Sequence, residues 1–379
     1  MPWKEKTIVS QRLEFVTLAL AEDADISQLC RRYGISRTAG YKWIHRFQEG
    51  GEEALQDRSR RPHTSPHRTS AVTEQAILRV RDAHPVWGGR KIRARLKKEG
   101  FPDLRSPSTI TEVLRRHRRL EPKESAKHRP FKRFEMAKPN ELWQIDFKGH
   151  FALEQGGRCH PLTILDDYSR FLVGLRACDR EDRETVQAEL TGIFRLYGLP
   201  ERMLMDNGAP FGTGGHRRYS KLNAWMIRLG IEVSHGRPRH PQTQGKDERL
   251  HRTLKAELLN EQQLEDLQDS QSHFDLWRDM YNQERPHEAL GMAVPSTRYQ
   301  PSPTPFPESL PPIDYPLSDT IRQVDITGRI SFRNRLFSVG KAFADQPVAL
   351  RPIEIDGIFD VYFCQQKIDQ ISFREDNQA

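Results

Sequence analysis

Residues 143–175, WQIDFKGHFALEQGGRCHPLTILDDYSRFLVGL, hold three short apolar runs. The runs cover 143–147, 162–165 and 171–175, and a polar Asp-Asp-Tyr-Ser-Arg turn separates the last two. Short runs rich in Ile, Leu, Val and Phe and bounded by turn residues are typical of buried strands. Three strands so close together in sequence predict an antiparallel meander.

The chain after this meander alternates between helical and extended patterns, with Gly198 and the Asn207-Gly208 pair as stops. We expect helices at 184–197 and 220–229, strands at 202–206 and 231–234, and a long helix that begins near 245. Three antiparallel strands followed by this alternation predict a central α/β domain with a mixed, ribonuclease H-like sheet.

Three acidic residues stand out in this pattern. Asp146 lies inside an apolar strand, where an uncompensated charge is costly. Asp206 ends another apolar strand, and Glu248 lies in the first turns of the long helix. Each alone is more often a cap or a surface charge. Together, carboxylates that converge on strand and helix ends repel one another unless a cation neutralises them.

A hard divalent cation suits such a site. Mg²⁺ prefers oxygen ligands and keeps waters and phosphate oxygens in its shell. Two ions about 4 Å apart activate an attacking oxygen and stabilise the leaving one in an in-line phosphoryl transfer, without a Ser, Cys or His nucleophile. We therefore expect Asp146, Asp206 and Glu248 to be both metal ligands and catalytic residues.

Neighbouring acids compete for two of these roles. Asp166 and Asp167 are alternatives to Asp146 as the first metal ligand. They directly precede Tyr-Ser-Arg, so we expect them instead to stabilise that turn. Asp247 and Glu257 compete with Glu248. The apolar side of the long helix is marked by Leu250, Leu254 and Leu258, whereas the opposite side carries Glu248, Arg252 and Lys255.

The charge of the chain is unevenly distributed. The whole sequence has 60 Lys+Arg and 52 Asp+Glu, a formal net charge of +8. Residues 1–135 hold 30 basic and 17 acidic side chains, so their net charge is +13 and that of residues 136–379 is −5. The excess of positive charge in the first third of the chain predicts that this part binds a polyanion such as DNA.

Residues 1–56 show the pattern of a helix-turn-helix domain. Asp25 and Ser36 are placed to cap the second and third helices, and Gly34 supplies the turn between them. The first turns of the third helix offer the DNA contacts Arg37, Thr38, Tyr41 and Lys42. A generic three-helix bundle with solvated charges is the alternative.

A basic linker, 57–70, separates this domain from a second helical domain, 71–119. Arg58, Arg60 and Arg61 could enter a minor groove or neutralise phosphates, although a merely solvated tether is an equal alternative. In the second domain the candidate DNA contacts are Arg90, Lys91, Arg115 and Arg116. Two basic helical domains in tandem predict a long, bipartite double-stranded DNA site.

The remaining boundaries follow from composition. Residues 120–139 form a second linker and 140–300 the α/β domain. Residues 301–316 hold seven prolines, which favours an extended, semi-rigid spacer. Residues 317–379 contain short strands and an Asp-Gly turn, which predict a small all-β barrel.

Several classes of protein are excluded by composition. The longest apolar stretches resemble 171–175, far short of a membrane span, and the N-terminus lacks the apolar core of a signal peptide. The four cysteines lie far apart, which excludes a disulfide framework or a four-cysteine zinc site. We expect a soluble, cytoplasmic protein.

Three motifs carry a resemblance to a known family. Trp-Gln-Ile-Asp-Phe at 143–147, Met-Asp-Asn-Gly at 205–208 and His-Pro-Gln-Thr-Gln-Gly-Lys-Asp-Glu-Arg at 240–249 resemble the Asp-Asp-Glu integrase core of bacterial insertion-sequence transposases, members of the retroviral-integrase superfamily. The resemblance extends from the helix-turn-helix to Tyr-Asn-Gln-Glu-Arg-Pro-His at 281–287. It implies that Asp146, Asp206 and Glu248 bind two Mg²⁺ or Mn²⁺ ions, in a protein associated with the bacterial nucleoid.

One spacing departs from the family. The 41 residues between Asp206 and Glu248 are several more than is usual there, and Gly-Thr-Gly-Gly-His at 212–216 resembles a loop insertion. Lengthening a surface loop by a few residues costs little free energy, so the assignment of Glu248 is kept.

The expected activity is transposition. Residues 1–119 would bind the terminal inverted repeats of the mobile element, metal-activated water would cut one strand at each end, and the freed 3′-hydroxyl would attack target DNA. Because two ends must meet, a homo-oligomeric synaptic complex is expected. The cations expected along the DNA path, with solvated helix charges as the alternative, are Lys246, Arg249, Arg252 and Lys255.

Two other functions remain open at this point. A DNA-binding repressor with a catalytically inactive core would share the same helical domains. A ribonuclease H-type nuclease would share the carboxylates but would not need two basic helical domains.

Overall fold

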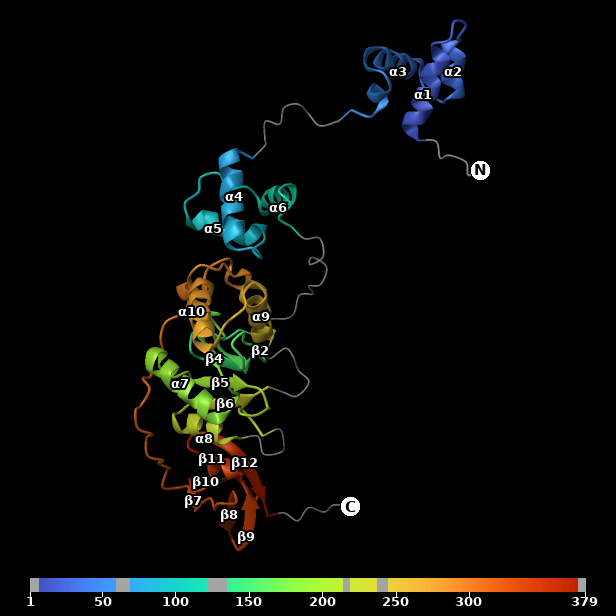
Figure 1. Cartoon of the computed structure of the whole chain (residues 1–379). Helices are drawn as coiled ribbons and strands as arrows, with labels where there is room; N and C mark the ends of the chain where they lie inside the picture. Colours follow the sequence, from blue (N-terminus) through green and yellow to red (C-terminus); the bar gives the residue numbers. More distant parts are fainter. Residues whose placement is uncertain (1–6, 59–68, 121–134, 214–218, 237–244, 374–379) are drawn as a thin grey trace, which may run out of the picture. The chain divides into compact units, whose positions relative to one another are not determined.

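The computed structural model of the chain describes residues 7–58, 69–120, 135–213, 219–236 and 245–373 (Figure 1). The chain forms two compact units, residues 1–68 and residues 69–379.

The first unit is a three-helix domain. Its elements are α1 (Ile8–Ala19), α2 (Ile26–Arg32), α3 (Arg37–Gly50) and the short helix η1 (Glu52–Leu55). The Asp25 side chain accepts the N–H groups of Ser27 and Gln28, and Ser36 accepts that of Ala39, so both expected caps are present. Phe15, Val16, Cys30, Ile44 and Leu55 close the core.

A close approach of α2 and α3 depends on Gly40. A Cβ added at Gly40 would lie 2.6 Å from the Cys30 sulfur and 3.1 Å from the Phe15 ring. Gly34, between these two helices, has a φ of +67°, a conformation that glycine adopts at no steric cost. The second helix, the glycine turn and the third helix that the sequence predicts are therefore all present.

The second unit begins with another helical bundle. Its helices are α4 (Ala71–Ala83), α5 (Gly89–Lys98) and α6 (Pro107–Arg116). Ser106 caps α6 and Pro107 occupies its first turn. The core of the bundle consists of Ile77, Val80, Trp87, Ile92, Leu96, Ile110, Val113 and Leu114.

The central domain is built on a mixed sheet. Its strands are β1 (Trp143–Phe147), β2 (Phe151–Ala152), β3 (Arg158–Asp166), β4 (Leu172–Cys178), β5 (Arg202–Met205) and β6 (Glu232–His235). β3 pairs antiparallel with both β1 and β4, which confirms the expected meander, and β2 extends the pairing at the start of β3. β1 pairs parallel with β5, and β5 with β6. The order β4-β3-β1-β5-β6 is that of a ribonuclease H-like sheet.

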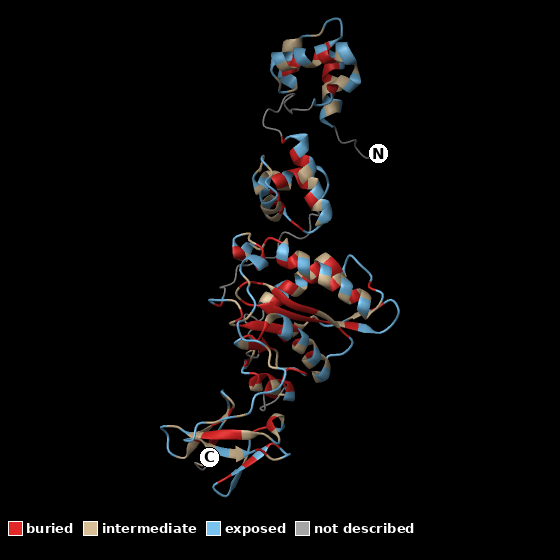
Figure 2. Cartoon of the chain, turned by 90° about the vertical axis from the view of Figure 1, so that its left-hand side faces the viewer, coloured by how far each residue is buried: buried red, intermediate tan, exposed pale blue. Residues whose placement is uncertain are grey.

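Helices cover both faces of this sheet. α7 (Arg183–Tyr197) and α8 (Lys221–Arg228) share one core with Ile145, Ile164 and Met203. α9 (Gly245–Leu254) and α10 (Leu267–Gln283) share another with Leu165, Leu172 and Leu175. Figure 2 shows the strands buried between these layers. The remaining short segments are a π-helical turn, η3 (Lys255–Leu259), and the 3₁₀ turns η4 (Glu288–Leu290) and η5 (Pro295–Thr297).

The C-terminal domain consists of antiparallel strands. β7 (Thr320–Gln323), β10 (Pro347–Pro352), β11 (Ile358–Phe363) and β12 (Gln366–Ser372) form one sheet in the order β12-β11-β10-β7. β8 (Arg329–Phe332) and β9 (Arg335–Ser338) form a hairpin, followed by the 3₁₀ turn η6 (Lys341–Phe343). The hairpin packs on the sheet, because the Phe332 and Phe359 rings lie 5.0 Å apart.

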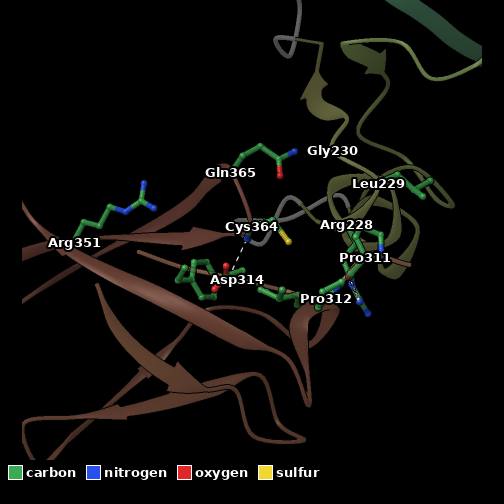
Figure 3. Close-up of a pocket in the computed structure, with 11 residues that line it drawn as sticks. Arg228, Leu229, Gly230, Pro311, Pro312, Asp314, Arg351, Cys364 and Gln365 are labelled. Carbon is green, nitrogen blue, oxygen red and sulfur yellow. Dashed lines mark hydrogen bonds between the residues drawn. The ribbon is translucent and has the colours of Figure 1, made fainter. Parts of the chain in front are cut away.

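The proline-rich segment is extended, as expected, but it lies against the central domain. Ser302 donates its N–H to the carbonyl of Tyr197, and Leu199 donates to that of Thr304. Arg228, at the end of α8, donates to the Pro311 carbonyl at 2.8 Å. Here α8, this segment and the C-terminal domain line a shallow pocket (Figure 3).

The edge strand β6 is paired by a side chain. The Gln366 amide accepts the N–H of Val233 at 2.9 Å and donates to the Val233 carbonyl at 2.7 Å. It also donates to the Tyr219 hydroxyl at 3.0 Å. The start of β12 is thereby attached to the end of the central sheet.

Candidate catalytic carboxylates and nucleic-acid interface

Asp146 and Asp206 lie side by side on neighbouring parallel strands. The last paired rung between β1 and β5 is Gln144 with Leu204, and each aspartate lies two residues beyond it. Because the carboxyl ends of parallel strands meet at the same edge, both side chains reach one place in the sheet. The strand register therefore brings two of the three candidate catalytic residues together.

Both carboxylates have a raised proton affinity. Burial first, and the charge of Asp206 second, raise the pKa of Asp146 to about 7, although the Phe147 N–H opposes the shift. Burial also raises the pKa of Asp206, against the Gly208 N–H that holds its charged form. The nearby negative charge of Glu181 also raises the pKa of both carboxylates.

This pair fits a divalent cation. Oδ1 of Asp206 is buried and has no hydrogen-bond partner among the described residues. A cation would satisfy that oxygen and relieve the repulsion that raises the pKa of Asp146. The donors are carboxylate oxygens, the ligands that Mg²⁺ prefers.

Glu248 is exposed in the first turn of α9, whereas its neighbour Asp247 is 2% exposed. Burial, and the charges of Asp146 and Asp167, raise the pKa of Asp247 well above its usual value. Within the described ranges, no three His, Cys, Asp or Glu side chains are arranged to hold a metal ion. The first five residues of the motif at 240–249, His-Pro-Gln-Thr-Gln at 240–244, lie outside the described residues.

The geometry of α9 explains this arrangement. Each residue of an α-helix turns by about 100°, so Asp247 lies about 40° to one side of the direction of His251 and Glu248 about 60° to the other. His251 points to Asp146, with 4.0 Å between its Nδ1 and the Asp146 Oδ2. Asp247 therefore faces the sheet and Glu248 faces solvent, one helical turn from His251.

The competing acids have structural roles. Asp166 accepts the backbone N–H groups of Asn140 and Ser169 and the Ser169 hydroxyl, so it braces the turn as the sequence predicts. Asp167 accepts the Met136 N–H and the Gln144 amide. Glu257 pairs with the buried Arg285 at 3.0 Å.

His251 and Thr163 were not predicted from the sequence to be part of this site. His251 follows Glu248 by three residues and Asp247 by four on the same helix, and this spacing could have indicated that it lies near them. The position of Thr163 directly opposite Asp146 depends on strand register, which the sequence does not define.

The expected DNA contacts of the first unit lie on its surface. Arg37, Thr38, Tyr41 and Lys42 are all exposed on α3, and Tyr41 is 54% exposed. Arg58 is exposed as well, whereas Arg60 and Arg61 lie outside the described residues. This face of α3 is available to a groove of DNA.

The expected contacts of the second helical bundle are mostly paired with acids. Arg115 pairs with Glu112, and Arg116 pairs with Glu74 at 2.5 Å. Arg90 pairs with Glu288 at 3.3 Å. Burial, and repulsion by Arg285, lower the pKa of Lys91 to about 8. Lys91 is thus partly desolvated, and its expected DNA contact remains a prediction.

The cations of α9 divide into two groups. Arg249, Arg252 and Lys255 are exposed, as expected for residues along a DNA path. Lys246 points inward, with its side chain 17% exposed and its Nζ 2.5 Å from Oδ1 of the buried Asp167. Contact between Lys246 and DNA would require this ion pair to open.

Family descriptions match each of the folded domains of the chain. The integrase core domain matches residues 136–241, and a second integrase core description matches 229–295. The C-terminal domain of IS481 family transposases matches 319–379. A homeodomain-like domain matches 39–114 and a helix-turn-helix domain 11–63.

Two relatives come from insertion elements. The IS476 uncharacterized 39.2 kDa protein of Xanthomonas euvesicatoria is 24% identical over 296 residues, which are 77% of this chain and 78% of that protein. The IS407 uncharacterized 31.7 kDa protein of Burkholderia multivorans is 28% identical over 158 residues, 42% of this chain. The chain spans 54% of the IS407 protein.

A solved structure is similar at low identity. A chain of the simian T-cell lymphotropic virus intasome, solved with PP2A regulatory subunit B56 gamma, is 14% identical, with a TM-score of 0.38. The match covers 78% of this chain and 96% of that one. Separately, the described helices include none that is long and apolar enough to cross a bilayer.

Proposed function

This chain belongs to the insertion-sequence transposases of the retroviral-integrase superfamily, and from that membership we propose that it binds the terminal inverted repeats of its mobile element and catalyses metal-dependent DNA strand cleavage and strand transfer into target DNA. The observation that carries this proposal is the Asp146–Asp206 pair. Two desolvated carboxylates at the same edge of a parallel strand pair are suited to hold a cation against a phosphate.

The proposal assigns the metal ligands to Asp146, Asp206 and Glu248. Two divalent cations, Mg²⁺ or Mn²⁺, would be held by these residues, and they would supply an activated oxygen nucleophile and stabilise charge on the leaving oxygen. Glu248 is exposed in the first turn of α9, and its carboxylate would have to turn toward the aspartates to join them. Asp247 is not assigned as a ligand, because the sequence motif points to Glu248 and the Asp247 side chain is almost fully buried.

DNA would be held by residues outside the carboxylates. The exposed face of α3 would read one part of the terminal repeat and the second helical bundle another. Arg249, Arg252 and Lys255 lie on the exposed side of α9 beside Glu248, where they would neutralise phosphates near the scissile bond. Two copies or more would assemble on paired ends.

The test is strand cleavage and joining with the purified full-length chain, Mg²⁺ and duplexes that carry the element's ends. Asp206→Asn and Glu248→Gln should abolish both reactions and leave end binding in a gel-shift assay intact. Glu261→Gln, at another exposed glutamate just after the same helix, is the matched control. Joining that persists in either active-site variant would refute the carboxylate assignment.

The same assay separates the alternatives. A repressor with an inactive core would bind the ends without any metal-dependent nicking. A ribonuclease H-type nuclease would cleave an RNA–DNA hybrid and leave the duplex ends whole.

A further inference from the structure

One mostly buried side chain of α9 reaches across to β3, the neighbour of the strand that carries Asp146. The His251 side chain is 12% exposed, and its Nε2 lies 2.8 Å from the Thr163 hydroxyl oxygen. Thr163 is on β3, directly opposite Asp146 in the β1–β3 ladder. The contact therefore joins a helix and two strands at the level of a candidate metal ligand.

The direction of the hydrogen bonds can be assigned. The Thr163 hydroxyl lies 3.0 Å from the backbone carbonyl oxygen of Asp146, which can only accept. The single hydroxyl proton is therefore given to Asp146, and the hydroxyl oxygen accepts from His251. Nε2 of His251 must therefore carry a proton.

The ring makes one hydrogen bond at this site. Nδ1 of His251 lies 4.0 Å from Oδ2 of Asp146, beyond hydrogen-bond distance, whereas Nε2 lies 2.8 Å from the Thr163 hydroxyl oxygen. The Thr163 hydroxyl therefore sets the orientation of the ring.

We propose that His251 and Thr163 form a positioning relay, in which the His251 N–H, the Thr163 hydroxyl and the Asp146 carbonyl hold α9 in register with β1. This inference rests on the proposed transposase function. Glu248 lies three residues before His251, which is about 4.5 Å along the helix axis. When His251 is held beside Asp146, the backbone of Glu248 is held at a set distance from the same site. Neither His251 nor Thr163 contacts the reacting atoms in this role.

Matched substitutions separate this role from simple packing. His251→Gln places an amide N–H near the position of Nε2 and keeps the donor, whereas the shorter His251→Asn cannot reach Thr163. Thr163→Ser keeps the hydroxyl, and the nearly isosteric Thr163→Val removes it. We expect His251→Asn and Thr163→Val to lower the rate of strand joining by about tenfold or more, with end binding unchanged, while His251→Gln and Thr163→Ser stay within about threefold of the parent.

Two further measurements make the test specific. The concentration of Mg²⁺ that gives half-maximal joining should rise in the two relay-breaking variants only. The double variant His251→Asn/Thr163→Val should be no slower than the slower single variant, because both changes remove one connected interaction. Full additivity of the two effects, or equal losses in the Gln and Ser variants, would overturn the relay in favour of packing.

The relay can also be tested without any activity. Ring ¹⁵N chemical shifts of His251 in the full-length parent should report a proton on Nε2, and Thr163→Val should perturb them. A ring that carries no proton on Nε2 would refute the assignment. A parent that shows this proton but never cleaves DNA would instead refute the proposed function.

Discussion

Lys246 and Asp167 form an ion pair, 2.5 Å between Nζ and Oδ1, at the first turn of α9. The Asp167 side chain is fully buried, and the Met136 N–H and the Gln144 amide also donate to it. The pair links the start of α9 to the end of β3. It stands next to Asp247 and Glu248, the residues on which the metal assignment depends.

Breaking this pair should destabilise the second unit. Lys246→Met leaves the Asp167 carboxylate buried without its cation, which costs about 3 kcal/mol in the free energy of unfolding. Asp167→Asn in the same chain should restore part of the loss, since the uncompensated charge is then gone. Urea unfolding monitored by tryptophan fluorescence measures both values. A single variant as stable as the parent would contradict the buried pair.

Asp247→Asn and Glu248→Gln should have opposite outcomes. Oδ1 of Asp247 is buried without a hydrogen-bond partner among the described residues, so the neutral amide should be tolerated and strand joining should persist. Glu248→Gln should lower joining by about a thousandfold or more if Glu248 is a metal ligand. If the two results were exchanged, Asp247 would be the third ligand.

Stability should fall with rising pH because of Asp146. The folded chain keeps the Asp146 proton up to about pH 7, whereas an ordinary Asp carboxyl releases its proton at a pKa of 3.8. The folded state binds more protons between these values, so the free energy of unfolding decreases as pH rises from about 4 to about 7, by about 3 kcal/mol. Asp146→Asn should flatten this part of the profile. Chemical denaturation at half-unit pH steps, without divalent ions, gives the slope.

Mg²⁺ should reverse this loss. A cation that binds the ionised pair only in the folded state raises the melting temperature as its concentration increases. The effect should be larger at pH 7.5 than at pH 5.5, where protons compete for Asp146. Asp206→Asn should remove the response, and Ca²⁺ and Na⁺ serve as ionic controls. An equal shift in the variant would indicate a site elsewhere.

Gly40→Ala should destabilise the first unit alone. The added methyl would lie 2.6 Å from the Cys30 sulfur, so α2 and α3 must separate at a cost of about 1 to 3 kcal/mol. Gly192→Ala on α7 is the control, because a Cβ there meets nothing within 4 Å and alanine favours a helix. Calorimetry should show a lower transition for the first unit and an unchanged one for the second.

The sequence predicted the elements whose signals are local. The meander, the helix caps at Asp25 and Ser36, and the apolar side of α9 all follow from spacing and turn chemistry. Helix α10 was missed, although Phe274, Trp277 and Tyr281 mark its buried side at helical spacing. Its remaining residues are polar enough to resemble a loop.

The candidate site was less accessible to sequence reasoning. The Asp146–Asp206 pair follows from two strand ends, which local patterns locate. The inward direction of Lys246 depends on Asp167, 79 residues earlier, and on the rotation of α9 against the sheet. Helical periodicity places Asp247, Glu248 and His251 around one axis, but tertiary packing decides which of them faces Asp146.

The contact of Gln366 with Val233 has a consequence for any attempt to isolate the catalytic core. A side-chain amide here takes the place of a neighbouring strand and occupies an N–H and a carbonyl that would otherwise be open to another chain. A fragment cut after residue 316 would expose that backbone, and bare strand edges recruit further strands. The C-terminal domain would then serve as an intramolecular guard against self-association, and truncated cores would be prone to oligomerise for reasons unrelated to synapsis.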